Sequence, residues 1–173
     1  FKIFVFSQFI ILNKYYQYLS GDISREELYS IIPEKLMNSV LNIEISPKTI
    51  GNIFKYVDTV LNAKRLDIII GGPPCQAYSL VGRARDANHM KKDSRNYLYN
   101  YYTEFLLKYE PRYFLFENVT GLLSAKNING EFYFDKMLKA FSGAGYSTEY
   151  KIISADAYGV PQNRKRIFII GRY

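Results

Sequence analysis

The stretch Asp67-Ile-Ile-Ile-Gly-Gly-Pro-Pro-Cys75-Gln-Ala-Tyr-Ser79 organises the fold that we predict for this chain. A short β-branched run that ends at glycines is typical of a buried strand in a parallel sheet, so we expect a strand at Asp67–Ile70. Gly71 and Gly72 allow a sharp turn, and the two prolines stiffen the chain after it. The sequence therefore places Cys75, the only cysteine of 173 residues, just past the carboxyl end of a strand, where open α/β sheets bind ligands.

A lone cysteine is most often a small buried hydrophobic residue. Cys75, however, lies outside the predicted strand, is followed by the polar Gln76 and Ser79, and precedes the basic stretch Gly82-Arg-Ala-Arg-Asp86. A nucleophilic thiolate requires partial exposure and nearby positive charge, which lowers its pKa. The surroundings of Cys75 in the sequence favour a nucleophile.

Two further motifs lie beside predicted strands. Glu117-Asn118-Val119 follows a strand at Tyr113–Phe116, and Gln162-Asn-Arg164-Lys-Arg166 precedes a strand at Ile167–Ile170. Together with Pro74-Cys75-Gln76, and in the same order, these motifs resemble those of the cytosine-5 DNA methyltransferases. The resemblance covers about residues 52–173 well and the first fifty residues poorly.

The resemblance implies a specific chemistry. Carbon 5 of cytosine is a poor nucleophile, and attack of the Cys75 thiolate on carbon 6 would make it enamine-like, so that it can take the methyl group of S-adenosylmethionine. Glu117 would hydrogen-bond the base and offset the charge that attack pushes into the ring. Arg164 and Arg166 alternate in an extended segment, so one face would present both to the base carbonyl and the DNA backbone. The target cytosine has to be flipped out of the duplex.

Other site residues also follow from the resemblance. For the cofactor they are Asn52, Pro74 and Leu98; Asn52 stands where the family usually has an aspartate, so it keeps a hydrogen-bonding group and loses the charge. For the substrate they are Gln76, Ser79, Arg83, Arg85, Asn118, Val119 and Gln162. His89 has no second residue of metal-binding type near it, and we predict no metal site.

The implied fold is α/β: a Rossmann-like, S-adenosylmethionine-dependent methyltransferase sheet, mostly parallel, with an antiparallel final hairpin and incomplete at the N-terminus. Residues 1–173 are expected to form a partial catalytic domain without a target-recognition domain, because no glycine-rich cofactor motif precedes Ile3 and the last family motif is absent. We expect the chain alone neither to bind S-adenosylmethionine tightly nor to methylate DNA. Missing flanks or a second polypeptide would complete the enzyme.

Local patterns predict the remaining elements. A strand at Ile3–Phe6 and a helix at Gln8–Leu19 open the chain, and Ser24–Glu27 has capping-box spacing before a helix. Pro33 ends that helix or starts another through Val40, and residues 21–45 are predicted to be a helical insertion. Apolar residues at helical spacing mark three further helix faces: Ile53, Phe54, Val57, Val60 and Leu61; Leu98, Tyr101 or Tyr102, Phe105, Leu106 and Tyr109; and Phe134, Met137, Leu138 and Phe141. Residues 146–155 and 166–171 are expected to pair as the final hairpin.

The composition of the chain limits the classes of function that fit it. A net charge of +7 favours a polyanionic partner such as double-stranded DNA, and no apolar run is long enough to cross a bilayer. One cysteine rules out an internal disulfide framework, which fits a reducing cytoplasm. The resemblance implies a prokaryotic-like cytoplasmic protein, associated with the nucleoid and belonging to a restriction-modification system. One cysteine also excludes a zinc deaminase, and His89 is a poor partner for a thiol protease. An RNA cytosine methyltransferase and a non-catalytic nucleic-acid-binding remnant stay open as alternatives.

Overall fold

The computed structural model describes residues 2–74, 78 and 97–173, which form two compact units, Phe1–Glu44 and Ile45–Tyr173. Among the sequence predictions, those for Cys75, Gln76, Ser79, Arg83, Arg85 and His89 lie outside the described residues. The two units are described separately below.

The first unit is helical. It contains α1 (Lys2–Ser20), α2 (Arg25–Ser30) and α3 (Glu34–Met37). The Ser24 side chain accepts a hydrogen bond from the backbone N–H of Glu27 at 3.1 Å, which confirms the predicted cap of α2. Two predictions were wrong here: residues 3–6 belong to α1 and not to a strand, and the helix after Pro33 ends at Met37 instead of running through Val40.

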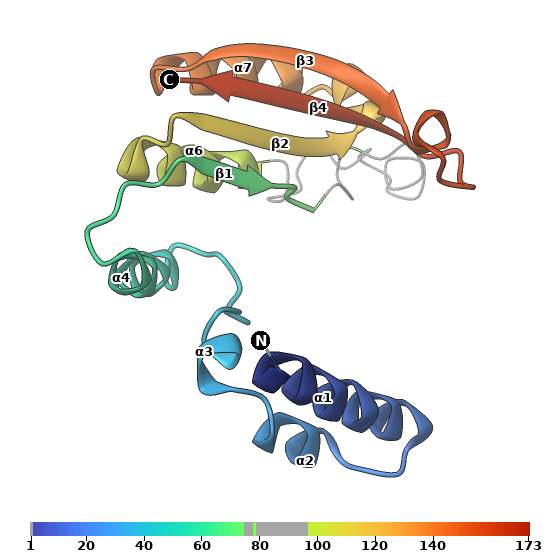
Figure 1. Ribbon diagram of the computed structural model, residues 1–173. Helices are drawn as coiled ribbons and strands as arrows, with labels where there is room; N and C mark the ends of the chain where they lie inside the picture. The colour runs from blue at the N-terminus through green and yellow to red at the C-terminus, as the bar shows by residue number, and fades with distance from the viewer. Residues whose placement is uncertain (1, 75–77, 79–96) are drawn as a thin grey trace. The chain divides into compact units, whose positions relative to one another are not determined.

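The second unit is α/β, as predicted. Its elements in chain order are α4 (Ile50–Leu61), β1 (Ile68–Gly71), α6 (Leu98–Tyr109), β2 (Tyr113–Val119), the 3-10 helix η2 (Thr120–Ser124), α7 (Tyr133–Gly143), β3 (Ser147–Ser154), the 3-10 helix η3 (Ala155–Tyr158) and β4 (Lys165–Arg172). The strands form one sheet in the order β1-β2-β4-β3, and Figure 1 shows them side by side.

The direction of the strands confirms the predicted crossover and the predicted hairpin. β1 and β2 run parallel, joined through α6, while β4 is antiparallel to both β2 and β3. Among the described strands the sheet is therefore mixed, with its parallel pair at one side and its hairpin at the other. Because β1 and β2 are parallel and Gly71 is level with Phe116, the end of β1 and the Glu117 motif lie at the same edge of the sheet.

The hydrophobic core lies between one face of the sheet and the helices α6 and α7. Phe114, Phe116, Ile167 and Ile169 point from the strands into this core and are fully buried. Tyr102 of α6 packs edge-on against Phe114, Phe116 and Phe141, the last of which belongs to α7. Both helices therefore cover the same face. Tyr102 and Leu106 of the predicted α6 stripe are buried in this core, and Tyr99 is a buried residue that the predicted stripe did not include.

The opposite face of the sheet carries apolar side chains that remain accessible. Side chains alternate across a strand, so Ile68 and Ile70 point away from the core into which Ile69 packs. Ile68 is 45% exposed, Ile70 is 69% exposed, and Ile170 of β4 is 48% exposed. The edge of β1 away from β2 has no strand partner among the described residues.

Helix α4 packs against α6 by aromatic and polar contacts. The ring of Phe54 meets those of Phe105 and Tyr109, with centroids 4.9 and 5.9 Å apart. The Tyr109 hydroxyl donates to the backbone carbonyl of Phe54 and to Asp58, which also pairs with Lys108 at 3.0 Å. The predicted apolar spacing of α4 thus provides the contact through Phe54, while Val60 of the same pattern is exposed.

Candidate active site

Glu117 and Arg166 form an ion pair at the edge of the sheet where β1 ends. Glu117 lies near the end of β2, and Arg166 near the start of β4, where it is level with Val119. The two side chains are on the sheet face away from the core, with Arg166 Nε 2.9 Å from Glu117 Oε1. Their side chains are 36% and 20% exposed, so a ligand at this edge can reach the carboxylate. The structure thus joins two residues that the sequence analysis assigned to one site.

The segment that leaves β1 passes directly beside Glu117. A Cβ atom on Gly72 would lie 2.9 Å from Glu117 Oε2 and 3.3 Å from the Glu117 backbone oxygen, and one on Gly71 would lie 2.7 Å from the Tyr102 ring. Neither glycine has a positive φ, so close approach, rather than the predicted freedom to turn, explains why glycine is needed here. The described chain continues to Pro74, one residue before the predicted nucleophile.

The buried side chain of Asn118 connects β2 to the segment that follows β1. Its side chain is 1% exposed; its Nδ2 donates to the backbone oxygen of Pro73 at 3.3 Å, and its Oδ1 accepts from Val119 N at 2.9 Å. Both polar atoms are therefore engaged within the protein, and Val119 is half-buried. These contacts fix the Gly-Pro-Pro segment against β2, a role for Asn118 that the sequence analysis missed.

Arg164 and Gln162 lie outside the strand that carries Arg166. β4 begins at Lys165, and both residues precede it with exposed side chains. The Arg164 backbone oxygen accepts a hydrogen bond from Ala155 N at 3.0 Å, which closes the segment between η3 and β4. Among the described residues, Glu117 pairs with Arg166 and has no ion pair with Arg164. The extended segment in which both arginines were predicted to share one face begins only at Lys165, after Arg164.

The three predicted cofactor residues come from three places in the second unit. Asn52 is exposed on the first turn of α4, Pro74 is exposed after β1, and Leu98 is half-buried as the first residue of α6. No hydrogen bond of the described residues joins them. Their side chains offer one amide and two apolar surfaces.

Tyrosines hold the elements around the site together. The Tyr102 hydroxyl donates to the backbone oxygens of Ile69 and Leu115 at 3.1 and 3.2 Å, bridging β1 and β2, and burial raises its pKa. Tyr133, the first residue of α7, packs against Tyr78 and Tyr97 with ring centroids 5.6 and 5.8 Å apart. Tyr78 and Tyr97 are the described residues that flank positions 79–96, so one buried ring contacts both.

Comparison with known proteins identifies the family. A family model described as C-5 cytosine-specific DNA methylase matches residues 34–172, and the chain belongs to that family. The chain is 45% identical over 116 residues to the type II methyltransferase M.Bpa9945I of Bacillus paralicheniformis, which is 63% of this chain and 26% of that protein. It is 40% identical over 114 residues to M.XorII of Xanthomonas oryzae pv. oryzae, covering 64% of this chain and 25% of the relative.

A solved structure gives the same fold. A prophage-encoded protein of E. coli, described as a candidate DNA modification methyltransferase, superposes with a TM-score of 0.50 and 32% sequence identity, over 74% of this chain and 31% of its own. The chain spans about a quarter of the length of the curated relatives it matches. None of the helices in the described part of the chain is both long and apolar enough to span a membrane.

Proposed function

We propose that this chain carries the catalytic residues of a DNA (cytosine-5)-methyltransferase. The main support is the pairing of Glu117 with Arg166 beside Gly72, on the segment that leads to the single cysteine. Membership of the C-5 cytosine-specific DNA methylase family and the type II methyltransferases among its relatives agree with this reading. The substrate that we propose is a cytosine flipped out of double-stranded DNA.

In the proposed reaction Cys75 is the nucleophile. Its thiolate adds to carbon 6 of the cytosine, forming a carbon–sulfur bond as the π bond between carbons 5 and 6 opens and moving electron density to carbon 5, which takes the methyl group. Loss of the carbon-5 proton to a base then re-forms the double bond and expels the Cys75 thiolate. When bound, S-adenosylmethionine supplies an electrophilic methyl group. The residues proposed to hold it are Asn52 at the adenine edge, with Pro74 and Leu98 packing against its apolar surface.

Glu117 acts on the base rather than on the thiol. Its carboxyl group would hydrogen-bond the ring nitrogen and amino group of cytosine and stabilise the charge that the attack of the thiolate creates. Arg166 fixes the carboxyl group in position through its Nε, while its Nη1 donates to the Lys165 backbone oxygen at 2.8 Å. The remaining guanidinium nitrogen, Nη2, would meet the base carbonyl or a phosphate. Arg164 and Gln162, exposed just before β4, would contact the DNA backbone.

A segment exchange tests the proposal. The part of M.Bpa9945I that aligns with this chain is replaced by the chain's own residues, and transfer of radiolabelled methyl groups is measured on duplex DNA and on tRNA. We expect transfer to DNA and none to tRNA, with Cys75→Ala abolishing it. A covalent complex with duplex DNA that contains 5-fluorocytosine should form with the parent exchange protein and not with Cys75→Ala.

The controls separate chemistry from folding. Ser142→Ala, an exposed change on α7, should leave both methyl transfer and covalent trapping unchanged. Circular dichroism and titration with S-adenosylmethionine show that the exchange protein is folded and binds its cofactor. A folded, cofactor-binding exchange protein that methylates tRNA and not DNA, or that stays active with Cys75→Ala, would contradict the proposal.

A further inference from the structure

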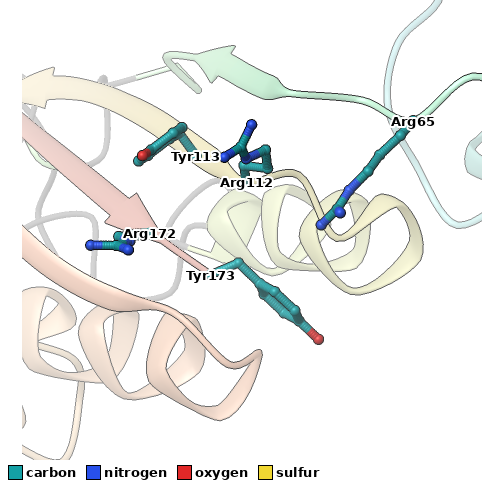
Figure 2. Close-up of a pocket in the computed structure, with 5 residues that line it drawn as sticks. All are labelled: Arg65, Arg112, Tyr113, Arg172 and Tyr173. Atoms are coloured by element: carbon teal, nitrogen blue, oxygen red, sulfur yellow. The ribbon is translucent and has the colours of Figure 1, made fainter.

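A second, strongly basic site lies at the end of the sheet away from Glu117. It is a pocket of about 170 Å³ lined by Arg65, Arg112, Tyr113, Arg172 and Tyr173. Figure 2 shows that the three arginines come from separate segments: the loop before β1, the residue before β2, and β4. Tyr113 and Glu117 are four residues apart on β2, roughly 13 Å at the usual rise per strand residue, so this pocket is distinct from the candidate active site.

Backbone hydrogen bonds fix the floor of this pocket. Tyr113 pairs with Arg172 in the β2–β4 ladder, and Tyr113 N donates to the backbone oxygen of Asp67 at 3.0 Å. Tyr173 N donates to the backbone oxygen of Arg112 at 3.1 Å. The Cα positions of the lining residues on β2 and β4 are therefore set by strand pairing, so the arginines are presented from a defined framework.

The positive charge of the pocket is not neutralised within the described part of the chain. The ion pairs between described residues engage other cations, and none of them includes Arg65, Arg112 or Arg172. The lining contains no carboxylate; the acids nearest in sequence, Asp67 and Glu110, are exposed and do not line the pocket. Figure 2 shows the three guanidinium groups spread around the pocket rather than converging on one point, so an anion bound there would contact one or two of them and offset their repulsion.

The geometry points to a phosphate group as the ligand, and we propose that this pocket is a phosphate-binding site separate from the reaction. Guanidinium groups match phosphate oxygens with two parallel hydrogen bonds, which single-point cations do not. The pocket is smaller than the ~300–1,000 Å³ typical of sites for drug-sized ligands, so it suits a phosphate group without its nucleoside. The phosphate can come from a free anion or from a nucleic-acid backbone.

The first arm of the test uses pyrophosphate with the 173-residue chain. Binding is measured by isothermal titration calorimetry at constant ionic strength for the parent, for Arg112→Gln/Arg172→Gln, and for Lys139→Gln/Lys151→Gln. The two double variants lower the net charge equally, and the second changes exposed lysines on α7 and β3 that do not line the pocket. We expect the arginine variant to bind pyrophosphate at least tenfold more weakly, and the lysine variant to bind within twofold of the parent.

The second arm uses a duplex made only of A·T pairs, which contains no cytosine, so its outcome does not depend on the proposed methyl transfer. Its affinity is measured at several salt concentrations for the same three proteins. If the pocket holds a backbone phosphate, the magnitude of the slope of log K against log salt should decrease in the arginine variant by about one more than it does in the lysine variant. Thermal unfolding checks that all three proteins are equally folded.

The outcomes are distinct. Selective loss of pyrophosphate binding alone assigns the site to a free anion, and selective loss in both arms assigns it to nucleic-acid phosphates. If the arginine and lysine variants behave alike in both arms, including the case in which neither pyrophosphate nor duplex binds the parent, the proposal is wrong.

Discussion

At the scale of single residues, we expect the Glu117 carboxylate to combine a weak structural role with the central chemical role proposed for it. An ion pair that is partly open to water contributes at most about 1 kcal/mol to stability. Glu117→Gln in the segment-exchange protein should therefore leave folding and DNA affinity nearly unchanged. We expect it to slow methyl transfer by roughly 10²- to 10⁴-fold, because the amide cannot supply a proton to the ring.

Single-turnover methyl transfer and DNA affinity, measured separately, check this expectation. Glu149→Gln is the matched control, since Glu149 is an exposed glutamate on β3. A large loss of DNA affinity with an unchanged transfer rate would instead make Glu117 a structural residue.

Gly72 gives a second test at this scale. Its missing side chain leaves the space that Glu117 Oε2 occupies, so Gly72→Ala should displace the carboxylate or the segment that leads to Cys75. We predict a loss of methyl transfer of at least tenfold. Gly51→Ala on α4 is the control, because a Cβ there meets nothing within 4 Å. Equal activity of the two alanine variants would show that the close approach at Gly72 is not needed.

Local sequence motifs predicted that Glu117 and Arg166 lie together, and they did not predict contacts between residues that are distant in the sequence. The spacing around Glu117 and Arg166 was enough to place both in one site. The hydrogen bond from Asn118 to Pro73 joins residues 45 positions apart, and the sequence contains no local pattern for it. For the same reason the tight fit at Gly72 could not be distinguished from a turn, because it depends on a side chain of another strand.

At the scale of elements, the sequence predicts the second unit well because its patterns are strong. β-branched runs, glycine stops and apolar stripes located β1, β2, β4, α6 and α7 close to their observed bounds. The first unit was harder. Residues 2–20 contain no glycine or proline, so a helix that forms there can extend through residues 3–6 despite their β-branched and aromatic composition.

Tyr133 connects α7 to both described flanks of positions 79–96. Replacing this buried ring by Tyr133→Leu should cost about 2–3 kcal/mol of stability. It should also change the alkylation rate of Cys75, the only thiol of the chain, because Tyr78 follows Cys75 by three residues. The factor by which this rate differs from the rate in the urea-unfolded chain should become at least threefold smaller.

Phe141→Leu is the control for this experiment. Phe141 is also a fully buried aromatic residue of α7, and its described ring contacts are with Tyr102, Phe114 and Phe116, away from Tyr78 and Tyr97. It should lower stability by a similar amount without changing the alkylation rate. Equal effects of the two variants on Cys75 would refute a specific role for Tyr133.

Tyr146, the residue before β3, should make the free energy of unfolding sensitive to alkaline pH. Tyr146 donates a hydrogen bond to the backbone oxygen of Pro111 at 2.9 Å, and burial raises its pKa to about 12. An unfolded tyrosine titrates near pH 10, so this group's contribution is fully present below about pH 10 and is lost as the pH rises toward 12. Urea unfolding at pH 8 to 12 should show a steeper alkaline loss for the parent than for Tyr146→Phe, and parallel curves would contradict this.

At the scale of the whole molecule, the open face of the sheet should govern solution behaviour. Ile70 is 69% exposed on β1, whose outer edge has no strand partner among the described residues. Exposed apolar edge strands favour pairing with another chain. Ile70→Lys should therefore reduce concentration-dependent light scattering of the 173-residue chain, whereas Val60→Lys, at a similarly exposed apolar position on α4, should reduce it less.

The strand order also sets when the Glu117–Arg166 ion pair can form during synthesis. Among the described strands, β4 lies between β2 and β3 and is the last of the four in sequence, so these strands join only when β4 inserts between two earlier ones. Arg166 lies roughly 50 residues after its partner Glu117, so it is synthesised about 3–10 s later at ordinary translation rates. Over that interval β2 has an open edge beside the Glu117 motif. The Glu117–Arg166 pair therefore forms only after β4 has been made, and ribosome-bound chains arrested before β4 should be unable to pair this carboxylate.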